Sequence, residues 1–266
     1  MKIFIIGGKG RMGRWFAEFC SSQGHDVTVN DVKGRLIGFK FEKNLEKGCG
    51  NSDIIILATP LGKTNIVYKK IIACETKATI LDICSLKTPI LETIKKGRRL
   101  GKRIASVHPM FGPDTELLTD KNVLVCNCGD KNSVKKAKNL FKGTNAKVIE
   151  IKLDEHDKLM SYVLGLAHLN NILFFNALKN SGISFETLKN VGGTTFNNQI
   201  EVARDVANDN PELYYEIQAM NRHTPELLEI MQKSFDELKR DISNKDMEKF
   251  IKIIMNGRHY FRGRRK

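Results

Sequence analysis

The chain has 266 residues, of which 41% are hydrophobic and 28% are charged. This composition predicts a folded protein with one large domain or two modest ones, and it excludes a largely disordered chain. No apolar run approaches the roughly 20 residues that a membrane-spanning helix needs, and no cleavage signal follows the N-terminal apolar stretch. We therefore expect a cytoplasmic protein with no membrane partner.

The formal net charge of +14 is compatible with two kinds of partner. Clustered lysines and arginines neutralise the phosphates of nucleic acids, whereas a general basic surface attracts small anionic substrates and cofactors. Part of the basic excess lies in two separate segments, 95–103 and 258–266, and not in one stripe. This separation argues against a nucleic-acid partner, and we expect the second segment to be a solvated tail.

The cysteines are scattered along the chain and include no Cys-x-x-Cys pair. There are six of them, namely Cys20, Cys49, Cys74, Cys84, Cys126 and Cys128. This spacing predicts neither a zinc site nor a disulfide framework, so we expect free, buried thiols and no bound metal.

Short apolar runs alternate with helical or loop segments in the first part of the chain. They cover residues 2–6, 27–30, 53–58, 79–83, 103–107 and 122–126. Short runs bounded by Gly, Asp or Pro are typical of parallel strands that are buried on both faces. The pattern predicts a βαβ series and hence a doubly wound α/β domain over residues 1–152.

The pattern changes beyond this domain. Residues 159–178 form a long helical pattern that is apolar on most sides, which predicts a helix buried in a helical domain or in a subunit interface. Further helical patterns cover residues 211–221, 225–243 and 245–255, and two of them have Pro in the first turn. We therefore expect residues 153–266 to form an all-helical domain that makes a homodimer.

A glycine-rich loop follows the first predicted strand and opens a helical pattern over residues 12–21. Its sequence is Gly8-Lys9-Gly10-Arg11-Met12-Gly13. Glycines suit such a loop because the backbone has to turn sharply and approach a pyrophosphate without a Cβ atom in the way. The positive end of the following helix then faces the diphosphate. These features predict a dinucleotide-binding domain of the Rossmann type, with the six loop residues at the cofactor.

Asp31 ends the second predicted strand, about 20 residues beyond the loop, where an acidic side chain accepts hydrogen bonds from the adenosine ribose. It favours NAD, because a carboxylate repels the additional 2′-phosphate of NADP. Lys33 and Arg35 are near enough in the sequence to soften that repulsion, so NADP is a second candidate. Thr59 and Pro60 follow an apolar strand at the sheet edge where doubly wound folds bind ligands, so we expect them at the cofactor. A strand simply ended by proline is the alternative.

His108 lies between an apolar strand and a turn, in the segment Val107-His-Pro-Met-Phe-Gly-Pro113. An imidazole has a pKa close to neutrality, so it can take the hydroxyl proton of an alcohol while hydride leaves the carbon. The order of a cofactor loop followed by such a histidine predicts a dehydrogenase with His108 as its general base. A histidine that only caps a turn is the alternative.

Taken together, these motifs resemble those of the prephenate (or arogenate) dehydrogenase family of tyrosine biosynthesis. The similarity covers nearly the whole chain and rests on residues 7–13, Asp82-Ile-Cys-Ser-Leu-Lys87, residues 107–113, Glu155-His-Asp157 and Leu166-Ala-His168. That family oxidises and decarboxylates prephenate to 4-hydroxyphenylpyruvate with NAD as hydride acceptor. The resemblance implies the same reaction here, with the amino counterpart arogenate as the alternative substrate.

The resemblance also implies roles for four residues outside the loop. His108 would bind the ring hydroxyl and accept its proton, and Ser85 would orient that histidine and the nicotinamide. Arg204 would hold a substrate carboxylate, which matches the fork of a guanidinium. An exposed pair with Glu201 or Asp205 is the alternative. His168 would lie near the substrate, and a satisfied core histidine is the alternative.

Two positions depart from the family pattern. Gly165 stands where many members have a histidine, and Asn197 stands where some have an arginine. Both departures concern carboxylate recognition and not hydride transfer. Because the chain stops at residue 266, we expect no appended regulatory domain or chorismate mutase, and any feedback by tyrosine would act at the active site.

Two other functions stay open from the sequence. One is a β-hydroxy-acid or imine dehydrogenase of the same two-domain plan, although such enzymes usually rely on a lysine in the helical domain. The other is a binding protein that senses NADH without turning over a substrate. The segment around His108 favours prephenate dehydrogenation over both.

Overall fold

The computed structural model describes residues 1–263, which fall into two compact units. The first unit covers residues 1–222, and the second begins at His223. The first contains the β-sheet and most of the helices, and the second consists of two helices. The domain division expected after residue 152 stays a prediction.

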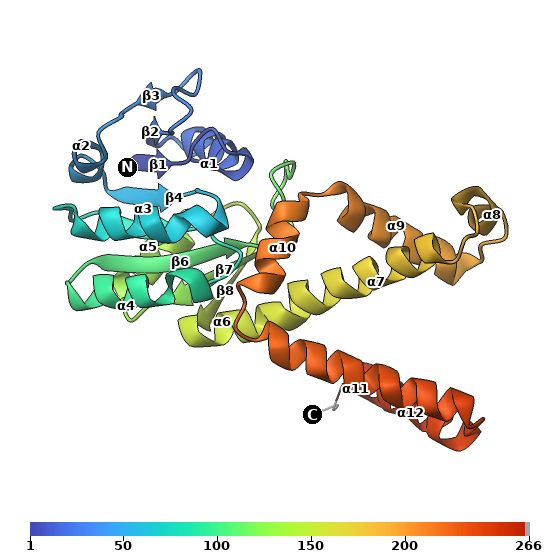
Figure 1. The fold of residues 1–266 in the computed structure, drawn as a ribbon. Coiled ribbons are helices and arrows are strands. Elements are labelled where there is room, and N and C mark those ends of the chain that lie inside the picture. The colour runs from blue at the N-terminus through green and yellow to red at the C-terminus, as the bar shows by residue number, and fades with distance from the viewer. Residues whose placement is uncertain (264–266) are drawn as a thin grey trace. The chain divides into compact units, whose positions relative to one another are not determined.

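The sheet of the first unit has eight strands in the order β3-β2-β1-β4-β5-β6-β7-β8 (Figure 1). The strands are β1 Lys2–Ile6, β2 Asp26–Asn30, β3 Lys40–Phe41, β4 Ile54–Leu57, β5 Thr79–Asp82, β6 Arg103–Pro109, β7 Asn122–Asn127 and β8 Lys147–Lys152. All neighbours are parallel except β6 and β7. The strand order reverses between β1 and β4, which confirms the doubly wound α/β domain of the Rossmann type.

Three features of the sheet differ from the sequence expectation. The two-residue strand β3 and the strand β8 were not expected, and most of the β8 side chains are exposed, so β8 lacks the continuous apolar run of a central strand. Strand β7 is antiparallel to β6, whereas the series was expected to be parallel. The chain between these two strands, residues 110–121, contains no helix and cannot make the crossover that a parallel neighbour requires.

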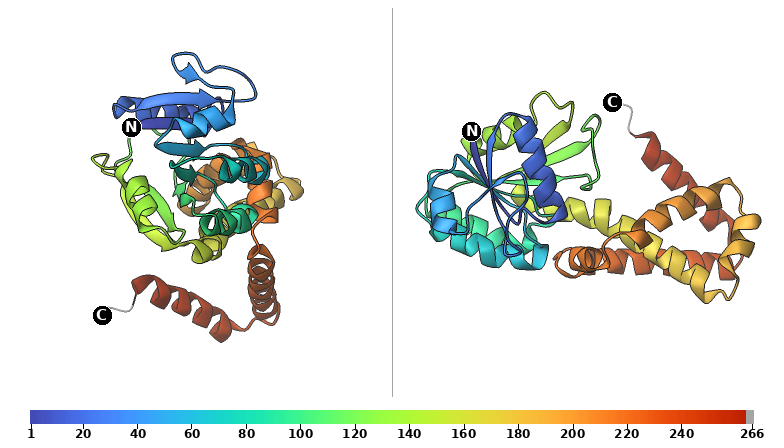
Figure 2. Two further views of the ribbon diagram at one scale, coloured as in Figure 1. Left: turned by 90° about the vertical axis from the view of Figure 1, so that its left-hand side faces the viewer. Right: turned by 90° about the horizontal axis from the view of Figure 1, so that it is seen from above.

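Helices cover both faces of the sheet (Figure 2). On one face lie α1 Arg11–Ser22 and α5 Lys131–Asn139, and on the other lie α2 Leu45–Gly50, α3 Leu61–Ala73 and α4 Leu91–Arg99, with the 3₁₀ turn η1 Thr88–Ile90 before α4. In β1, Ile3 and Ile5 face the first group, while Phe4 and Ile6 face the second. Each fully buried side chain of this size contributes about 1.5–3 kcal/mol, which explains why the central strands are apolar on both sides.

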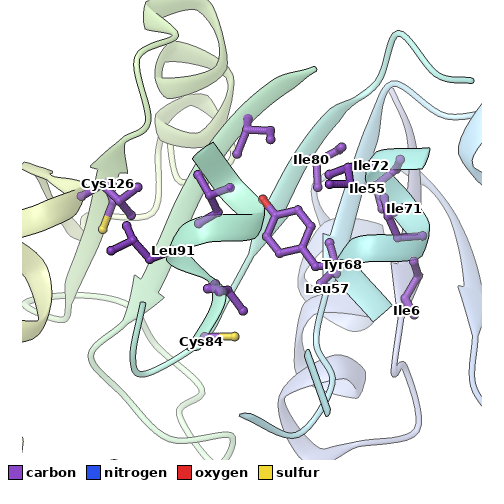
Figure 3. Close-up of a cluster of buried hydrophobic side chains, with 14 of the residues drawn as sticks. Ile6, Ile55, Leu57, Tyr68, Ile71, Ile72, Ile80, Cys84, Leu91 and Cys126 are labelled. Atoms are coloured by element: carbon purple, nitrogen blue, oxygen red, sulfur yellow. The ribbon is translucent and has the colours of Figure 1, made fainter. Parts of the chain in front are cut away.

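Tyr68 of α3 lies in the middle of the core beneath that helix. Figure 3 shows its ring among the side chains of Leu57, Ile71 and Ile80. The ring is fully buried, and its hydroxyl has no hydrogen-bond partner within residues 1–263. Burial of this phenol raises its pKa well above the ordinary value, so it stays protonated.

The first unit continues beyond the sheet as a series of helices. They are α6 Leu153–Met160, the π-helical segment η2 Ser161–Leu166, α7 Ala167–Asn180, α8 Phe185–Asn190, α9 Thr194–Asn208 and α10 Pro211–Ala219. The helix expected over 159–178 is therefore divided among α6, η2 and α7, and side chains such as Leu173 are exposed instead of buried within this chain. Helices α8 and α9 were not expected. Helix α8 is short and has no buried side chain, and the helical spacing of Phe196, Ile200 and Ala203 in α9 was missed.

The second unit contains α11 Thr224–Ser243 and α12 Met247–Arg262. Both helices were expected, but α12 extends into the basic segment 258–266 that was expected to be a solvated tail, and residues 264–266 of that segment lie outside the described residues. Apolar side chains of this unit, including Phe235, Ile254 and Phe261, are exposed. Within residues 1–263, no helix is both long and apolar enough to cross a bilayer.

Candidate active site

The glycine loop connects β1 to α1 at the point where the strand order reverses. Gly7 has φ +87°, and a Cβ atom there would lie 2.6 Å from the carbonyl oxygen of Ala58 at the end of β4. A Cβ atom on Gly13 would lie 2.1 Å from the carbonyl oxygen of Gly7. Gly10 caps α1 without a side-chain hydrogen bond, so the first N–H groups of the helix are available to an anion.

Asp31 lies beside this loop and is held by it. Its Oδ2 accepts a hydrogen bond from the backbone N–H of Lys9 at 2.9 Å, and its Oδ1 accepts one from that of Lys33 at 2.8 Å. The Lys9 ammonium also donates to the carbonyl oxygen of Lys33 at 3.1 Å. The fold therefore brings together the loop and the acidic side chain that the sequence analysis assigned to one cofactor.

Thr59 and Pro60 follow β4 on the other side of the reversal point. The Thr59 hydroxyl lies 2.9 Å from that of Thr64, and Pro60 is the residue before the first turn of α3. Glu216 of α10 accepts a hydrogen bond from the N–H of Gly62 at 3.2 Å. The N-terminus of α3 thus already has an anionic partner from this chain. Within residues 1–263, no carboxylate accepts a hydrogen bond from the first N–H groups of α1.

His108 is the first member of a buried hydrogen-bonded chain. It lies on β6 with only 4% of its surface exposed, and its Nδ1 is 3.0 Å from Nε2 of His156. His156 belongs to α6, and its Nδ1 is 2.6 Å from Oδ1 of Asp157. Asp157 also accepts hydrogen bonds from the backbone N–H of Lys87, at 2.8 and 3.0 Å, and from Thr88.

The charges in this chain determine where its protons lie. Burial pushes the pKa of Asp157 upward, but hydrogen bonds from His156 and Thr88 outweigh it and hold that pKa well below its usual range. The ionised carboxylate accepts a hydrogen bond from Nδ1–H of His156. Neutral His156 therefore presents its Nε2 lone pair to Nδ1–H of His108. Burial lowers the pKa of His108 well below 6.5. His108 is thus neutral, with its lone pair on Nε2.

Lys87 joins the two ends of this arrangement. Its fully buried ammonium donates to Oδ1 of Asp82 at 2.8 Å and to the carbonyl oxygens of Cys84 at 2.6 Å and Val107 at 2.9 Å. Burial opposes the charge of Lys87, but Asp82 outweighs it and raises the Lys87 pKa above its ordinary value. One residue therefore binds the backbone next to His108 through its side chain and Asp157 through its own N–H.

His156 and Asp157 belong to a motif that resembles the family but had no predicted role, and Lys87 had none either. The motif Glu155-His-Asp157 was the available signal. A sequence pattern could not show that the start of α6 reaches the end of β6, since 48 residues separate the two histidines.

Ser85 and His168 lie in different surroundings. Ser85 is half-buried between β5 and η1, and within residues 1–263 its side chain makes no hydrogen bond to His108. The His168 ring stacks on Tyr214, with 4.0 Å between the centroids and 13° between the planes. Its Nδ1 is buried and has no hydrogen-bond partner in the described chain.

Arg204 lies on α9 and contacts Glu201, which was the alternative to substrate binding. Its Nη1 is 3.5 Å from Oε1 of Glu201, and its guanidinium lies 5.1 Å from the centroid of the Phe185 ring. It borders a cavity of about 340 Å³ between α7, α8 and α9, which also includes Phe175 and Ile200. Among the described residues, no hydrogen bond or ion pair joins Arg204 to His108 or His168.

The cysteines and other possible metal ligands of residues 1–263 form no metal site. All six cysteines are free thiols, and burial raises the pKa of Cys20 and Cys126 to about 12. Within residues 1–263, no group of three or more His, Cys, Asp or Glu side chains is arranged to hold a metal ion. The sheet, its glycine loop and the histidine chain define a nucleotide-binding protein of the Rossmann class with a buried acid–base centre.

Comparison with known protein families agrees with this class and narrows it. Residues 23–150 match the nucleotide-binding domain of prephenate dehydrogenase, and residues 152–256 match the dimerization domain of prephenate dehydrogenase. The chain belongs to the prephenate dehydrogenase family. The predicted family and its nucleotide-binding domain are therefore confirmed.

Individual relatives show the extent of the similarity. The chain is 30% identical to the probable arogenate/prephenate dehydrogenase of Methanocaldococcus jannaschii, with 98% of this chain and 61% of that protein aligned. The chain thus spans somewhat less than two thirds of the length of that relative.

Two solved structures have the same fold. Prephenate dehydrogenase from A. aeolicus, in complex with hydroxyphenyl propionate and NAD+, superposes with a TM-score of 0.76 at 20% identity, covering 98% of each chain. Synechocystis arogenate dehydrogenase superposes with a TM-score of 0.75 at 18% identity, covering 97% of this chain and 98% of that one.

Proposed function

We propose that this protein is an NAD-dependent prephenate dehydrogenase, which converts prephenate to 4-hydroxyphenylpyruvate, carbon dioxide and NADH. The observation that carries the proposal is the buried chain from Asp157 through His156 to His108. It leaves Nε2 of His108 as a base at the end of β6, in a protein of this family. Arogenate is the second candidate substrate, because the M. jannaschii relative bears both names.

The glycine loop fits a dinucleotide. The close contacts of Gly7 and Gly13 leave room for backbone but not for a Cβ atom, and the uncapped N-terminus of α1 suits a diphosphate. Residues 8–13 would hold the diphosphate, and Thr59 and Pro60 would lie beside the cofactor across the reversal point. Asp31 would accept hydrogen bonds from the ribose, which favours NAD over NADP. The bound cofactor would supply the acceptor for the hydride.

His108 would act as the general base of the oxidation. Its Nε2 takes the proton of the ring hydroxyl as hydride leaves the carbon that bears this hydroxyl. Its Nδ1 keeps its own proton, which it donates to His156 in a hydrogen bond. The Asp157 carboxylate favours the positive charge that develops on the His108 ring. Loss of the ring carboxylate as carbon dioxide then makes the ring aromatic, and His108 returns its proton to the phenolate oxygen. Ser85 would orient His108 and the nicotinamide.

Two residues of the helical part are proposed to bind the substrate. His168 has a buried Nδ1 without a partner in the described chain, which could receive a polar group of the ligand. Arg204 borders an apolar cavity, and its exposed contact with Glu201 is weak enough to be exchanged for a substrate carboxylate. The dianionic substrate also agrees with the basic composition of the chain.

We further propose that the protein is a cytoplasmic homodimer. Apolar side chains on α7, such as Leu173, and on α12, such as Ile254, are about half exposed in the single chain. The segment 152–256 that contains them matches a dimerization domain. Sedimentation at micromolar concentration should give the mass of two chains, and a monomer would contradict this part of the proposal.

Initial rates of NADH formation at 340 nm test the reaction directly. Purified protein should reduce NAD in the presence of prephenate, and parallel assays with arogenate and with NADP would establish the substrate and the cofactor. The absence of turnover with all four combinations would refute the proposed reaction and leave the nucleotide-binding fold unaffected.

A further inference from the structure

The segment that follows His108 is attached to the helix that begins at the glycine loop. This segment, the 110–121 loop, connects β6 to β7 and contains no helix or strand. Trp15 of α1 donates its Nε1–H to the carbonyl oxygen of Thr115 at 2.8 Å. The Trp15 ring also packs on Phe111, with 5.0 Å between the centroids. A single side chain of α1 thus binds the loop both by a hydrogen bond and by ring packing.

A second contact joins the same two elements. Arg11, one turn before Trp15 on the same helix face, forms an ion pair of 2.6 Å with Asp114 of the loop. The two side chains are 63% and 87% exposed, so this pair is screened by solvent and contributes little. Arg11 also begins α1, where the cofactor diphosphate is proposed to bind. We therefore regard Trp15, which is half-buried, as the principal attachment.

Trp15 is itself held firmly in the first unit. Its ring stacks on Phe19, with centroids 4.9 Å apart and planes 17° apart, and Phe19 stacks in turn on Phe141 beyond α5. Phe141 is 2% exposed. Trp15 is therefore held by α1 and by its contact with Phe19, whereas among the described residues Phe141 makes no ring contact with Trp15 itself.

The 110–121 loop begins two residues after His108, the proposed base. Met110, the first residue of the loop, is two residues beyond His108, and its N–H donates to the carbonyl oxygen of Asn122 at 3.0 Å. Leu118 near the end of the loop is buried in the same core as α1. Both ends of the loop are thus fixed, and Trp15 holds its middle. A loop of this length without secondary structure would otherwise have many conformations.

We infer that Trp15 is a positioning residue for the reaction proposed above, because it ties the loop that follows His108 to the helix at the cofactor loop. The placement of the base relative to the cofactor loop then depends on one side chain. Trp15 does not touch the reacting atoms. The expected effect of Trp15 on the reaction rate rests on the proposed function. The attachment of the loop by Trp15 can be tested without turnover.

The kinetic test uses Trp15→Phe. Phenylalanine keeps a ring against Phe111 but cannot donate to the Thr115 carbonyl. We expect kcat to fall about tenfold, since small displacements of a catalytic group cost that much or more, while KM for NAD stays unchanged. The matched control is Phe141→Leu, which removes a ring from the same aromatic cluster without touching the loop. Its kcat should equal that of the wild type even where its melting temperature is lower.

Hydrogen exchange of the loop provides a readout that is independent of activity. In the wild type with saturating NAD, the amides of Gly112 and of residues 114–118 should exchange more slowly than in Trp15→Phe, and Phe141→Leu should match the wild type. Equal loop exchange in Trp15→Phe and the wild type would overturn the inference, as would an equal loss of kcat in the two variants. If the wild type turns over no substrate but the exchange difference is present, the proposed function fails while the loop attachment stands.

Discussion

His108 and His156 share a hydrogen bond of 3.0 Å between Nδ1 of the first ring and Nε2 of the second. Because His156 is bound on its other side to ionised Asp157, this bond fixes the tautomer of His108. The histidine on the strand is therefore prepared to accept a proton at Nε2 before any ligand binds. The role of His108 as general base, proposed from the sequence, gains a structural reason that the sequence did not contain.

Replacement of His108 by asparagine tests the base itself. Asparagine can keep a hydrogen bond to His156 but cannot take up a proton, so we expect kcat to fall by about 10² to 10⁴ with little change in KM. Steady-state rates of NADH formation provide the measurement. An unchanged kcat would remove His108 from the mechanism.

His156→Phe tests the support for that base. Phenylalanine fills a similar space but accepts no hydrogen bond, so the tautomer of His108 is no longer fixed. We expect kcat to fall less than in His108→Asn, that is by less than about 10²-fold. Activity should recover in part in His156→Asn, because the amide oxygen of asparagine can accept a hydrogen bond from His108. Equal activity of the phenylalanine variant and the wild type would show that the bond is structural only.

The pH dependence of kcat/KM follows from the burial of His108. Burial lowers its pKa, with smaller contributions from His156 and Lys87, so the free base persists below pH 6.5. We expect kcat/KM to stay constant from neutral pH down to 6.5 and to decline only at lower pH, as His108 becomes protonated. A decline centred above pH 6.5 would indicate a different base.

The free energy of unfolding should also depend on pH below 6.5. The pKa values of His108 and His156 are lowered in the folded protein, mainly by burial, whereas the unfolded chain protonates both near 6.5. The unfolded state thus binds more protons below that pH, and the free energy of unfolding should decrease as the pH falls below 6.5. Urea unfolding at several pH values measures this. The variant His156→Phe should show a shallower decrease.

The buried pair of Lys87 and Asp82 gives a prediction about folding. Lys87→Met leaves the Asp82 carboxylate buried without its cation, and we expect this to lower the free energy of unfolding by about 3–5 kcal/mol. The double variant Lys87→Met with Asp82→Leu removes both charges and should recover most of that loss. Urea unfolding of the two variants measures their free energies of unfolding. If the double variant is no more stable than Lys87→Met, the prediction is wrong.

Arg204→Ala tests substrate recognition. If Arg204 binds a carboxylate, its removal should weaken substrate binding by about 1.5–3 kcal/mol, seen as a higher KM for prephenate with a smaller effect on kcat. Glu201→Ala is the matched control, because it removes the partner of Arg204 and leaves the arginine free to bind substrate. If KM does not change in Arg204→Ala, another cation holds the carboxylates.

Several elements could be predicted because their signals are local. The run Ile54–Leu57 is apolar at every position and forms a central strand, and the glycines after β1 form the expected loop. Strand β8 and helix α8 could not be predicted, because their side chains are largely exposed. Helix α9 has Phe196, Ile200 and Ala203 at helical spacing, a local signal that was overlooked. The direction of β7 depended on whether the 110–121 loop crosses the sheet, which its composition does not reveal.

The sequence by itself determined the class of the protein, since a strand, a glycine loop and an acidic residue at the right spacing are short-range patterns with a physical cause. The tertiary structure alone decided which side chains meet. Asp157 reaches His156, His156 reaches His108, and Trp15 reaches Thr115 across 100 residues of chain. Such contacts depend on the packing of whole elements against the sheet, and no spacing within the chain encodes them.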